Sequence, residues 1–367
     1  MTPTVDLAPT AQLLLLAAIV AAVPLAYVWL RHRGGDARAR LAALTALTLF
    51  LTFDLIVFGS FTRLSDSGLG CPDWPGCYGS ASPFGARDEI HAAQTAQPTG
   101  PVTWSKAWIE MIHRYLAMTV GALILVMAVV SWIERRRLPH SPWWATLTLV
   151  WVVLQGLFGK FTVTLKLYPA IVTLHLVGGL LLLALLAIQH EAYRDRPLKL
   201  PRRTRQLAGW ALAALAVQIV LGGWVSTNYA VLACTGWPAC NGQWWPAMDW
   251  AQGFTVLREL GQSGSGATLS FDALVAIHFA HRWFVLVPLA LLLMLAWQLR
   301  VSDARESRRY AFGLVVLLVL QIVSGLSNVV LGWPLIAALG HSAGAAGLVL
   351  LMALLLARSA GAARPAT

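Results

Sequence analysis

Apolar stretches of about 20 residues, separated by short polar segments, make up most of the chain. An uncharged segment of that length crosses the hydrocarbon core of a bilayer as an α-helix. The first stretch is interpreted as a retained membrane helix, because a signal peptide carries basic residues before its apolar run and here they follow it. The pattern predicts nine membrane-spanning helices, at residues 11–30, 41–62, 108–132, 143–165, 169–190, 207–226, 273–299, 310–332 and 334–357.

The segments between these helices recur in the second half of the chain. "GSFTRLSDSGLGCPDWPGCYG" (59–79) aligns without a gap with "GGWVSTNYAVLACTGWPACNG" (222–242). The His-Arg pair at 113–114 recurs at 281–282, and His175 recurs at His341. Each repeat holds four spans, so the two copies are parallel in the membrane. The sequence therefore predicts an all-α integral membrane protein with two pseudo-symmetric four-helix bundles and one extra N-terminal helix.

The repeat also predicts the domain boundaries. Two bundles are separated by a basic cytoplasmic linker and flanked by an extra helix and a tail. The predicted domains are 1–40 (extra helix and cytoplasmic loop), 41–190 (first bundle), 191–206 (linker), 207–357 (second bundle) and 358–367 (tail).

Composition agrees with a membrane protein, since 58% of residues are hydrophobic and 12% are charged, against about 25% charged in soluble domains. The net charge of +11 does not call for a nucleic acid partner, because most Lys and Arg residues fall on one side of nine spans. That side is cytoplasmic by the positive-inside rule. We therefore expect a multi-pass protein of the bacterial cytoplasmic membrane, with its N-terminus outside and its C-terminus inside. The basic segments are 31–40, 134–137, 194–205, 300–309 and the C-terminal tail.

All four cysteines lie in the long connections 63–107 and 227–272, on the outer face. An oxidising compartment favours disulfides within each pair, each worth about 2 kcal/mol. Free thiols or a metal site remain alternatives, although the spacing is longer than in common zinc motifs. The predicted pairs are Cys71–Cys77 and Cys234–Cys240.

Four histidines lie at repeat-related places near the outer ends of predicted spans, within about 10 Å of the interface. Two imidazoles in an apolar bundle are typical of an iron porphyrin with two axial ligands, whereas zinc needs three or four ligands. Hydrogen-bonded structural histidines are the alternative. The candidate ligands are His113 and His175 in the first bundle, and His281 and His341 in the second.

Two further features sit beside these histidines. Arg114 and Arg282 each follow a candidate ligand and either pair with haem propionates or extend to the interface. Glu110 lies three residues before His113, on the same helix face, whereas the repeat position holds His278. This asymmetry predicts chemistry in the first bundle and electron transfer in the second. His278 is also an alternative ligand to His281, although the alignment favours His281.

The motifs "SGLGCPDWPGC", "EMIHRYLA" and "LQGLFGKFTV" before "TLHLVGG", with their second-half counterparts, resemble the haem A synthase family over about residues 41–357. The resemblance implies an oxidoreductase that converts the C8 methyl group of haem O to the formyl group of haem A by successive hydroxylations. It implies a fold of two four-helix bundles, with haem b in the C-terminal one and substrate haem in the N-terminal one. The span 11–30 has no counterpart in that eight-helix core.

By position, the resemblance makes His281 and His341 the haem b ligands and His113 and His175 the substrate-side histidines. It makes Glu110 the acid that takes part in the oxidation. It matches the four cysteines to outer-loop pairs with a structural or redox role. Haem O synthase, cytochrome oxidase assembly factors and a second copy of the chain are its candidate protein partners.

Three other functions compete with this interpretation. One is a chaperone that binds haem and hands it to an oxidase without converting the methyl group. A b-type cytochrome that only relays electrons explains the histidines and gives no role to Glu110. A thiol–disulfide oxidoreductase of the outer face explains the cysteines and ignores the histidines.

Overall fold

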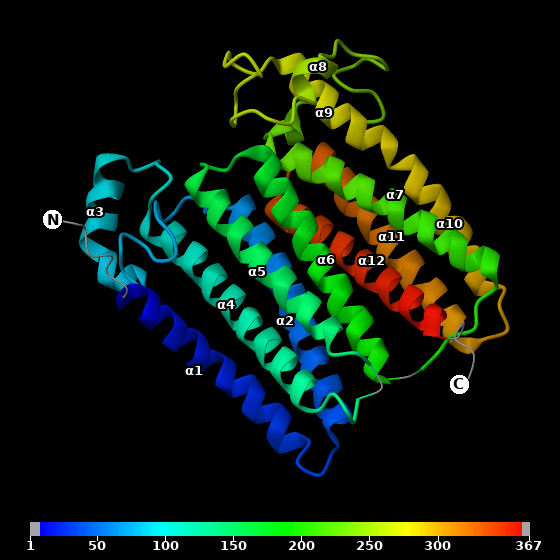
Figure 1. Ribbon diagram of the computed structural model, residues 1–367. Helices are drawn as coiled ribbons and strands as arrows, with labels where there is room; N and C mark the ends of the chain where they lie inside the picture. The colour runs from blue at the N-terminus through cyan, green and yellow to red at the C-terminus, as the bar shows by residue number, and fades with distance from the viewer. Residues whose placement is uncertain (1–7, 139, 195, 362–367) are drawn as a thin grey trace. The chain divides into compact units, whose positions relative to one another are not determined.

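The computed structural model describes residues 8–138, 140–194 and 196–361, and within these ranges the chain forms helices and loops without a β-strand (Figure 1). Residues 1–7 of the predicted first domain and 362–367 of the predicted tail lie outside this description.

The described residues contain nine helical segments long and apolar enough to cross a membrane, which confirms all nine predicted spans. One of them is divided into two helices, α9 and α10. The segments are α1 (Ala8–Arg31), α2 (Ala37–Leu64), α4 (Trp104–Ile133), α5 (Trp143–Thr164), α6 (Pro169–Arg194), α7 (Arg202–Thr227), α9 (Phe271–Phe284) with α10 (Leu286–Arg300), α11 (Arg305–Val330) and α12 (Leu335–Gly361).

The division of the predicted span 273–299 falls at Val285. Pro288 has no backbone N–H, so the helical hydrogen bond to the carbonyl of Phe284 is absent there. Helical bonding resumes at once, with the Leu289 N–H donating to the Val285 carbonyl at 3.0 Å. The interruption lies just after the His-Arg pair of the second repeat.

The two outer loops contain short helices that the apolar pattern did not predict. The first loop holds η1 (Pro83–Ala86) and α3 (Arg87–Ala96), and the second holds η2 (Ala230–Leu232) and α8 (Trp250–Gly253). Both loops therefore form structured caps over the outer ends of the spans.

Side-chain caps define the outer starts of the two helices that carry His-Arg pairs. Thr103 Oγ1 accepts from the Lys106 N–H at 3.3 Å at the start of α4, and Ser270 Oγ accepts from the Ala273 N–H at 3.2 Å at the start of α9. These caps satisfy backbone donors that the first turn leaves unpaired. They fix where each histidine-bearing helix begins.

The chain divides into two compact units, Met1–Leu167 and Tyr168–Thr367. In the first unit α4 packs against α1, α2 and α5 (Figure 1). In the second unit α12 packs against α6, α7 and α11, and α10 packs against α7 and α11. The assignment of residues 169–190 to a first four-helix bundle stays a prediction based on the repeat.

Helix ends repeat as the motifs do. Leu64 ends α2 and Thr227 ends α7, and this pair is separated by the same interval as the two cysteine motifs. Thr164 ends α5 and Val330 ends α11, at the interval that separates His175 from His341. The duplication therefore includes the C-terminal ends of these helices as well as the motifs.

Candidate functional site

Three of the four candidate histidines lie against a glycine on a neighbouring helix of the same unit. A β-carbon on Gly59 of α2 would come within 2.9 Å of His113 Cε1, and one on Gly222 of α7 within 2.8 Å of His281 Cε1. A β-carbon on Gly325 of α11 would lie 3.1 Å from His341 Cε1. Real β-carbons avoid such distances, so these positions leave room for an imidazole edge and for no side chain. The contacts of Gly59 and Gly222 are equivalent in the repeat.

His281 and His341 belong to one compact unit. Both side chains are partly exposed, whereas His278 is 5% exposed and its Nδ1 has no hydrogen-bond partner among the described residues. His281 and His341 are thus less buried as whole residues than His278. This contrast supports His281 over His278 as the ligand, and the assignment stays a prediction.

The Nδ1 atoms of this histidine pair face polar side chains. Ser324 Oγ lies 3.1 Å from His341 Nδ1 and 2.6 Å from the Leu320 carbonyl oxygen. Because the serine hydrogen is directed to the Leu320 carbonyl, the serine oxygen is oriented to accept a hydrogen bond from the His341 Nδ1–H. His341 Nε2 then carries the lone pair that a metal needs.

The side chain of Gln218 contacts His281 in the opposite sense, because an amide nitrogen donates and His281 Nδ1 therefore accepts. Gln218 Nε2 donates to the His281 backbone carbonyl at 3.0 Å and lies 3.1 Å from His281 Nδ1. Gln321 Nε2 donates to the His341 backbone carbonyl at 2.7 Å. Both glutamines come from helices that also supply a contacting glycine, α7 and α11. Each ligand candidate is thus held through its ring and its backbone.

In the first unit, the His113 ring lies nearly parallel to the Phe58 ring, with centroids 6.3 Å apart and planes at 15°. Gly59 and Phe58 are adjacent on α2, so this helix shapes the surroundings of the imidazole. His175 lies on α6 in the other compact unit, and its pairing with His113 stays a prediction.

Glu110 is 3% exposed and its two carboxylate oxygens have different partners. Oε2 accepts from the Cys71 N–H at 2.8 Å, and Oε1 accepts from Arg114 Nη2. The loop approaches α4 this closely because Gly70 has no side chain: a β-carbon there would lie 2.5 Å from the Lys106 carbonyl oxygen. The carboxylate is therefore fixed in position, one helical turn from His113.

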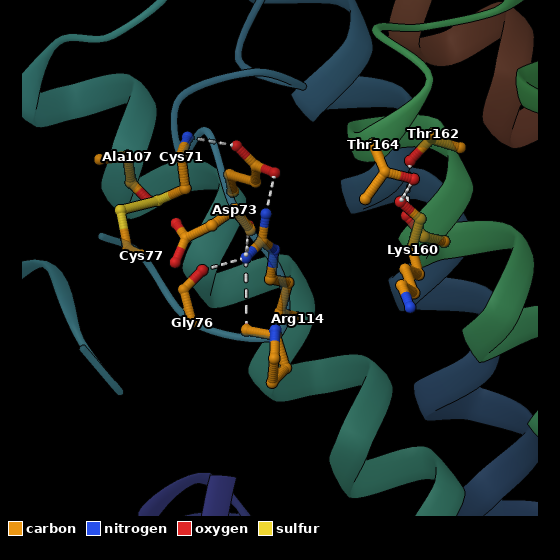
Figure 2. Close-up of polar contacts among 12 residues, drawn as sticks. Cys71, Asp73, Gly76, Cys77, Ala107, Arg114, Lys160, Thr162 and Thr164 are labelled. Carbon is orange, nitrogen blue, oxygen red and sulfur yellow. Dashed lines mark hydrogen bonds and ion pairs between the residues drawn. A yellow bond between two sulfur atoms is a disulfide. The ribbon is translucent and has the colours of Figure 1, made fainter. Parts of the chain in front are cut away.

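Arg114 and Arg282 bind the cysteine loops above them. Nη1 of Arg114 donates to the carbonyl oxygens of Asp73 at 2.9 Å, Pro75 at 3.2 Å and Gly76, beneath the loop that Figure 2 shows. Arg282 donates to three carbonyls in its own loop, those of Cys234, Gly236 and Ala239, at 2.8 to 3.2 Å. The structure thus gives both guanidinium groups a loop-binding role that the sequence did not suggest. Pairing with propionates stays a prediction.

Both predicted disulfides are present, Cys71–Cys77 and Cys234–Cys240. All four cysteines are at most 2% exposed and pack in apolar clusters. Beside the first disulfide, burial raises the pKa of the Tyr78 phenol, and the neighbouring carboxylates of Asp73 and Glu89 raise it further. In the second loop, burial lowers the pKa of Arg258, which donates to Asn228 Oδ1 at 2.5 Å. The loops are well-packed caps.

The donor set suits a porphyrin better than a bare metal ion. Across the described ranges, His, Cys, Asp and Glu side chains form no group of three or more that could hold a metal. Two imidazoles of one compact unit, one with Nδ1 bonded to a serine acceptor and both beside a glycine, fit an iron porphyrin that takes two axial ligands. His281 and His341 would hold that group in the second unit.

Sequence reasoning missed the residues that surround the ligand candidates. Ser324 and Gln218 have no counterpart of the same kind at their repeat positions, so the alignment did not single them out. Gly59 and Gly222 were visible as a repeated glycine. Their repetition was the signal, and only the structure shows that each one packs against a histidine.

A family model for the COX15-CtaA family, described as cytochrome oxidase assembly protein, matches residues 42–353. The chain is 41% identical to a protein named heme A synthase of Shewanella oneidensis over 316 residues, which cover 85% of this chain and 94% of that protein. It is 27% identical to a heme A synthase of Rhizorhabdus wittichii over 87% of this chain and 93% of the relative. It is 28% identical to a heme A synthase of Caulobacter vibrioides over 82% and 90%.

Proposed function

The chain belongs to the COX15-CtaA family of cytochrome oxidase assembly proteins, and from this premise we propose that it is a haem A synthase. It is an enzyme of the bacterial cytoplasmic membrane that oxidises the C8 methyl group of haem O to the formyl group of haem A. Two successive hydroxylations give a hydrated aldehyde, which loses water. The proposed orientation has the N-terminus outside and the C-terminus in the cytoplasm.

One observation carries the assignment of roles to the two halves: repeat-equivalent positions hold Glu110 in one and His278 in the other. Glu110 is buried, oriented by two donors, and one turn from His113. A fixed carboxylate in a poorly solvated place stabilises positive charge that develops nearby and accepts a proton from a reacting group. We assign the oxidation to the first half for this reason, with His113 and His175 as substrate-haem ligands.

The second half carries haem b as a resident group, held by His281 and His341. Bound there, haem b supplies one-electron transfer. The chain contributes the orientation of the two imidazoles, through Gln218, Ser324 and the glycine contacts. His278 stands in this half at the repeat position of Glu110. These features support electron relay by the second half alone.

The buried disulfides support a bracing role for the cysteines. Thiol–disulfide exchange needs access of a thiolate to a sulfur atom, and all four sulfur-bearing residues are almost fully buried. Arg114 and Arg282 anchor the loops further. An outer-face thiol–disulfide oxidoreductase is therefore the weaker interpretation.

Substitution of Glu110 tests the proposed function. Glu110→Gln keeps an oxygen that accepts from the Cys71 N–H but removes the charge. We expect the purified variant to retain haem b, to accumulate haem O and to yield about a hundredfold less haem A, or lower still, since acid–base catalysis contributes roughly a hundredfold or more. The measurement is extraction and separation of the haems by liquid chromatography.

Glu134→Gln is the matched control, because Glu134 lies just beyond the other end of α4 and pairs with Arg137 at 3.2 Å. The control is expected to make haem A at the normal level. Normal haem A output from Glu110→Gln would refute the role of Glu110. Wild-type protein that contains haem b alone, in cells that make haem O, would refute the synthase assignment.

A further inference from the structure

Cationic residues at the outer end of the first repeat have uncharged counterparts in the second. All of them lie on or next to the outer ends of spans, on the face that otherwise has few basic residues. This contrast is separate from the Glu110 difference. The cations are Arg63, Lys106, Lys160 and Lys166, and the residues at their repeat positions are Ser226, Leu274, Leu326 and Gly332.

Of these four cations, Lys160 is placed farthest from the end of its helix. It lies four residues before the end of α5 at Thr164, or about 6 Å along the helix. Its Nζ lies 5.9 Å from the centroid of the Trp74 ring, in the first cysteine loop. Within the described part of the chain, this aromatic ring is the contact of its ammonium group; no carboxylate forms an ion pair with it. Figure 2 shows Lys160 on its helix beside Thr162 and Thr164.

Other cations of the first unit are already committed to protein groups. Lys106 donates to Asp66 Oδ2 and to the Gly100 carbonyl, both at 3.3 Å. Arg114 directs its guanidinium to Glu110 and three loop carbonyls. Among the described residues, Lys160 pairs with no carboxylate, unlike Lys106 and Arg114. An ionisable group in a span is costly and usually pairs with a substrate or faces its pathway.

The repeat places Lys160 next to the haem-binding region. The dipeptide Gly159–Lys160 matches Gly325–Leu326 in the second repeat. Gly325 is the residue that packs against the His341 ring. Lys160 therefore follows the position that, in the second unit, touches a proposed iron ligand.

From these observations we propose that Lys160 binds a propionate carboxylate of the substrate haem in the first unit. The inference rests on the proposed function, since the substrate of a haem A synthase is a porphyrin with two propionates. A substrate must enter and leave, so an unpaired cation attracts it and is neutralised by it. Resident haem b does not exchange in each turnover, which accounts for Leu326 at the equivalent place.

The test compares haem O with its propionate dimethyl ester, which lacks the carboxylate charges. Each is titrated, in detergent, into purified protein that retains haem b, and binding is followed by difference absorption. We expect Lys160→Met to weaken binding of haem O about tenfold, and to leave binding of the dimethyl ester unchanged. Lys160→Arg is expected to bind haem O nearly as wild type does, because it keeps the charge.

Lys106→Met is the control for loss of an outer-face charge, and it should bind both probes as wild type does. The haem b content of each variant reports whether it has folded. Lys160→Met that binds haem O like wild type overturns the inference, and so does a variant that loses affinity for both probes equally. Wild-type protein that binds neither probe overturns the proposed function, and the role of Lys160 with it.

Discussion

At the scale of single residues, equivalent positions in the two halves show which groups build the fold and which serve chemistry. Arg114 and Arg282 share a position and a task, because each guanidinium group binds carbonyl oxygens of its cysteine loop. Glu110 and His278 share a position and differ in chemistry. The common arginine contact thus belongs to the loop architecture, whereas the acid belongs to one half only.

Substitution of Ser324 tests whether its hydrogen bond sets the tautomer of His341 for iron binding. The Ser324 oxygen is oriented to accept a hydrogen bond from the His341 Nδ1–H, and this tautomer leaves the Nε2 lone pair available to iron. We expect Ser324→Ala to lower haem b affinity roughly tenfold, the lower range for loss of a partner behind a metal ligand. Transfer of haem b to an excess of a haem-scavenging apoprotein measures this affinity, and redox titration should show a raised haem b potential.

Ser324→Thr retains the hydroxyl group and should restore both values. Equal haem b affinity and potential in Ser324→Ala and wild type would show that the serine does not act on the ligand. Serine at this place was not predictable from the repeat, because Phe158 occupies the equivalent position. The pattern of apolar residues predicts the span but does not predict a hydrogen bond made by a single serine within it.

At the scale of helices, small residues determine how closely an imidazole approaches its neighbour. Gly59 on α2, Gly222 on α7 and Gly325 on α11 each face a histidine ring at distances that exclude a β-carbon. The packing of these helices therefore also determines where the candidate ligand rings lie. Tight packing means that one added methyl group must displace either the ring or the helix.

Gly222→Ala tests this coupling in the second unit. The new β-carbon would lie 2.8 Å from His281 Cε1, so we expect the ring to shift and haem b content to fall at least about tenfold. The measurement is haem b per polypeptide, from pyridine haemochrome spectra. Gly209→Ala on the same helix is the control, because a β-carbon there meets nothing within 4 Å. Full haem b content in Gly222→Ala would contradict the packing argument.

All nine helical spans were predictable from apolar run length, because helices that satisfy their own backbone hydrogen bonds are what such runs form in a bilayer. The interruption of the span at Val285 was not predicted, although the sequence contains its cause, Pro288, which lacks a backbone N–H. The short helices of the outer loops were also missed. They depend on local caps and on packing against the disulfides, and not on periodicity.

At the scale of the whole molecule, the basic segments do more than orient the chain. Arg358 of α12 donates to the Arg196 carbonyl at 2.8 Å and pairs with Glu306 of α11. The Leu198 N–H donates back to the Arg358 carbonyl at 3.1 Å. The part of the linker that the structure describes is thus tied to the ends of two helices in the second unit. These groups belong to the proposed cytoplasmic side.

Fusion reporters test the proposed orientation. Nine spans place the C-terminus opposite the N-terminus, and the basic segments put the C-terminus in the cytoplasm. Green fluorescent protein fused there should fluoresce, and alkaline phosphatase fused there should be inactive. Phosphatase fused after Gly242, in the second outer loop, should be active. An active phosphatase at the C-terminus would reverse the assigned topology and place the cysteine loops in the cytoplasm.

The repeat allowed the candidate histidines to be predicted, because His113 recurs at His281 and His175 recurs at His341. Their surroundings were beyond the sequence: nothing in the residue order shows that Glu110 accepts from the Cys71 N–H, 39 residues earlier. Such contacts arise from loop folding. The division of the chain into functional halves remains a prediction from the motif repeat.

The paired glycine–imidazole contacts also bear on how the gene arose. Gly59 with His113 and Gly222 with His281 form the same contact in both halves, so its simplest origin is a half-length ancestor that already had it. Glu110 and Lys160 then mark divergence after duplication, in which the first half acquired the proposed oxidation and the second half the proposed electron relay.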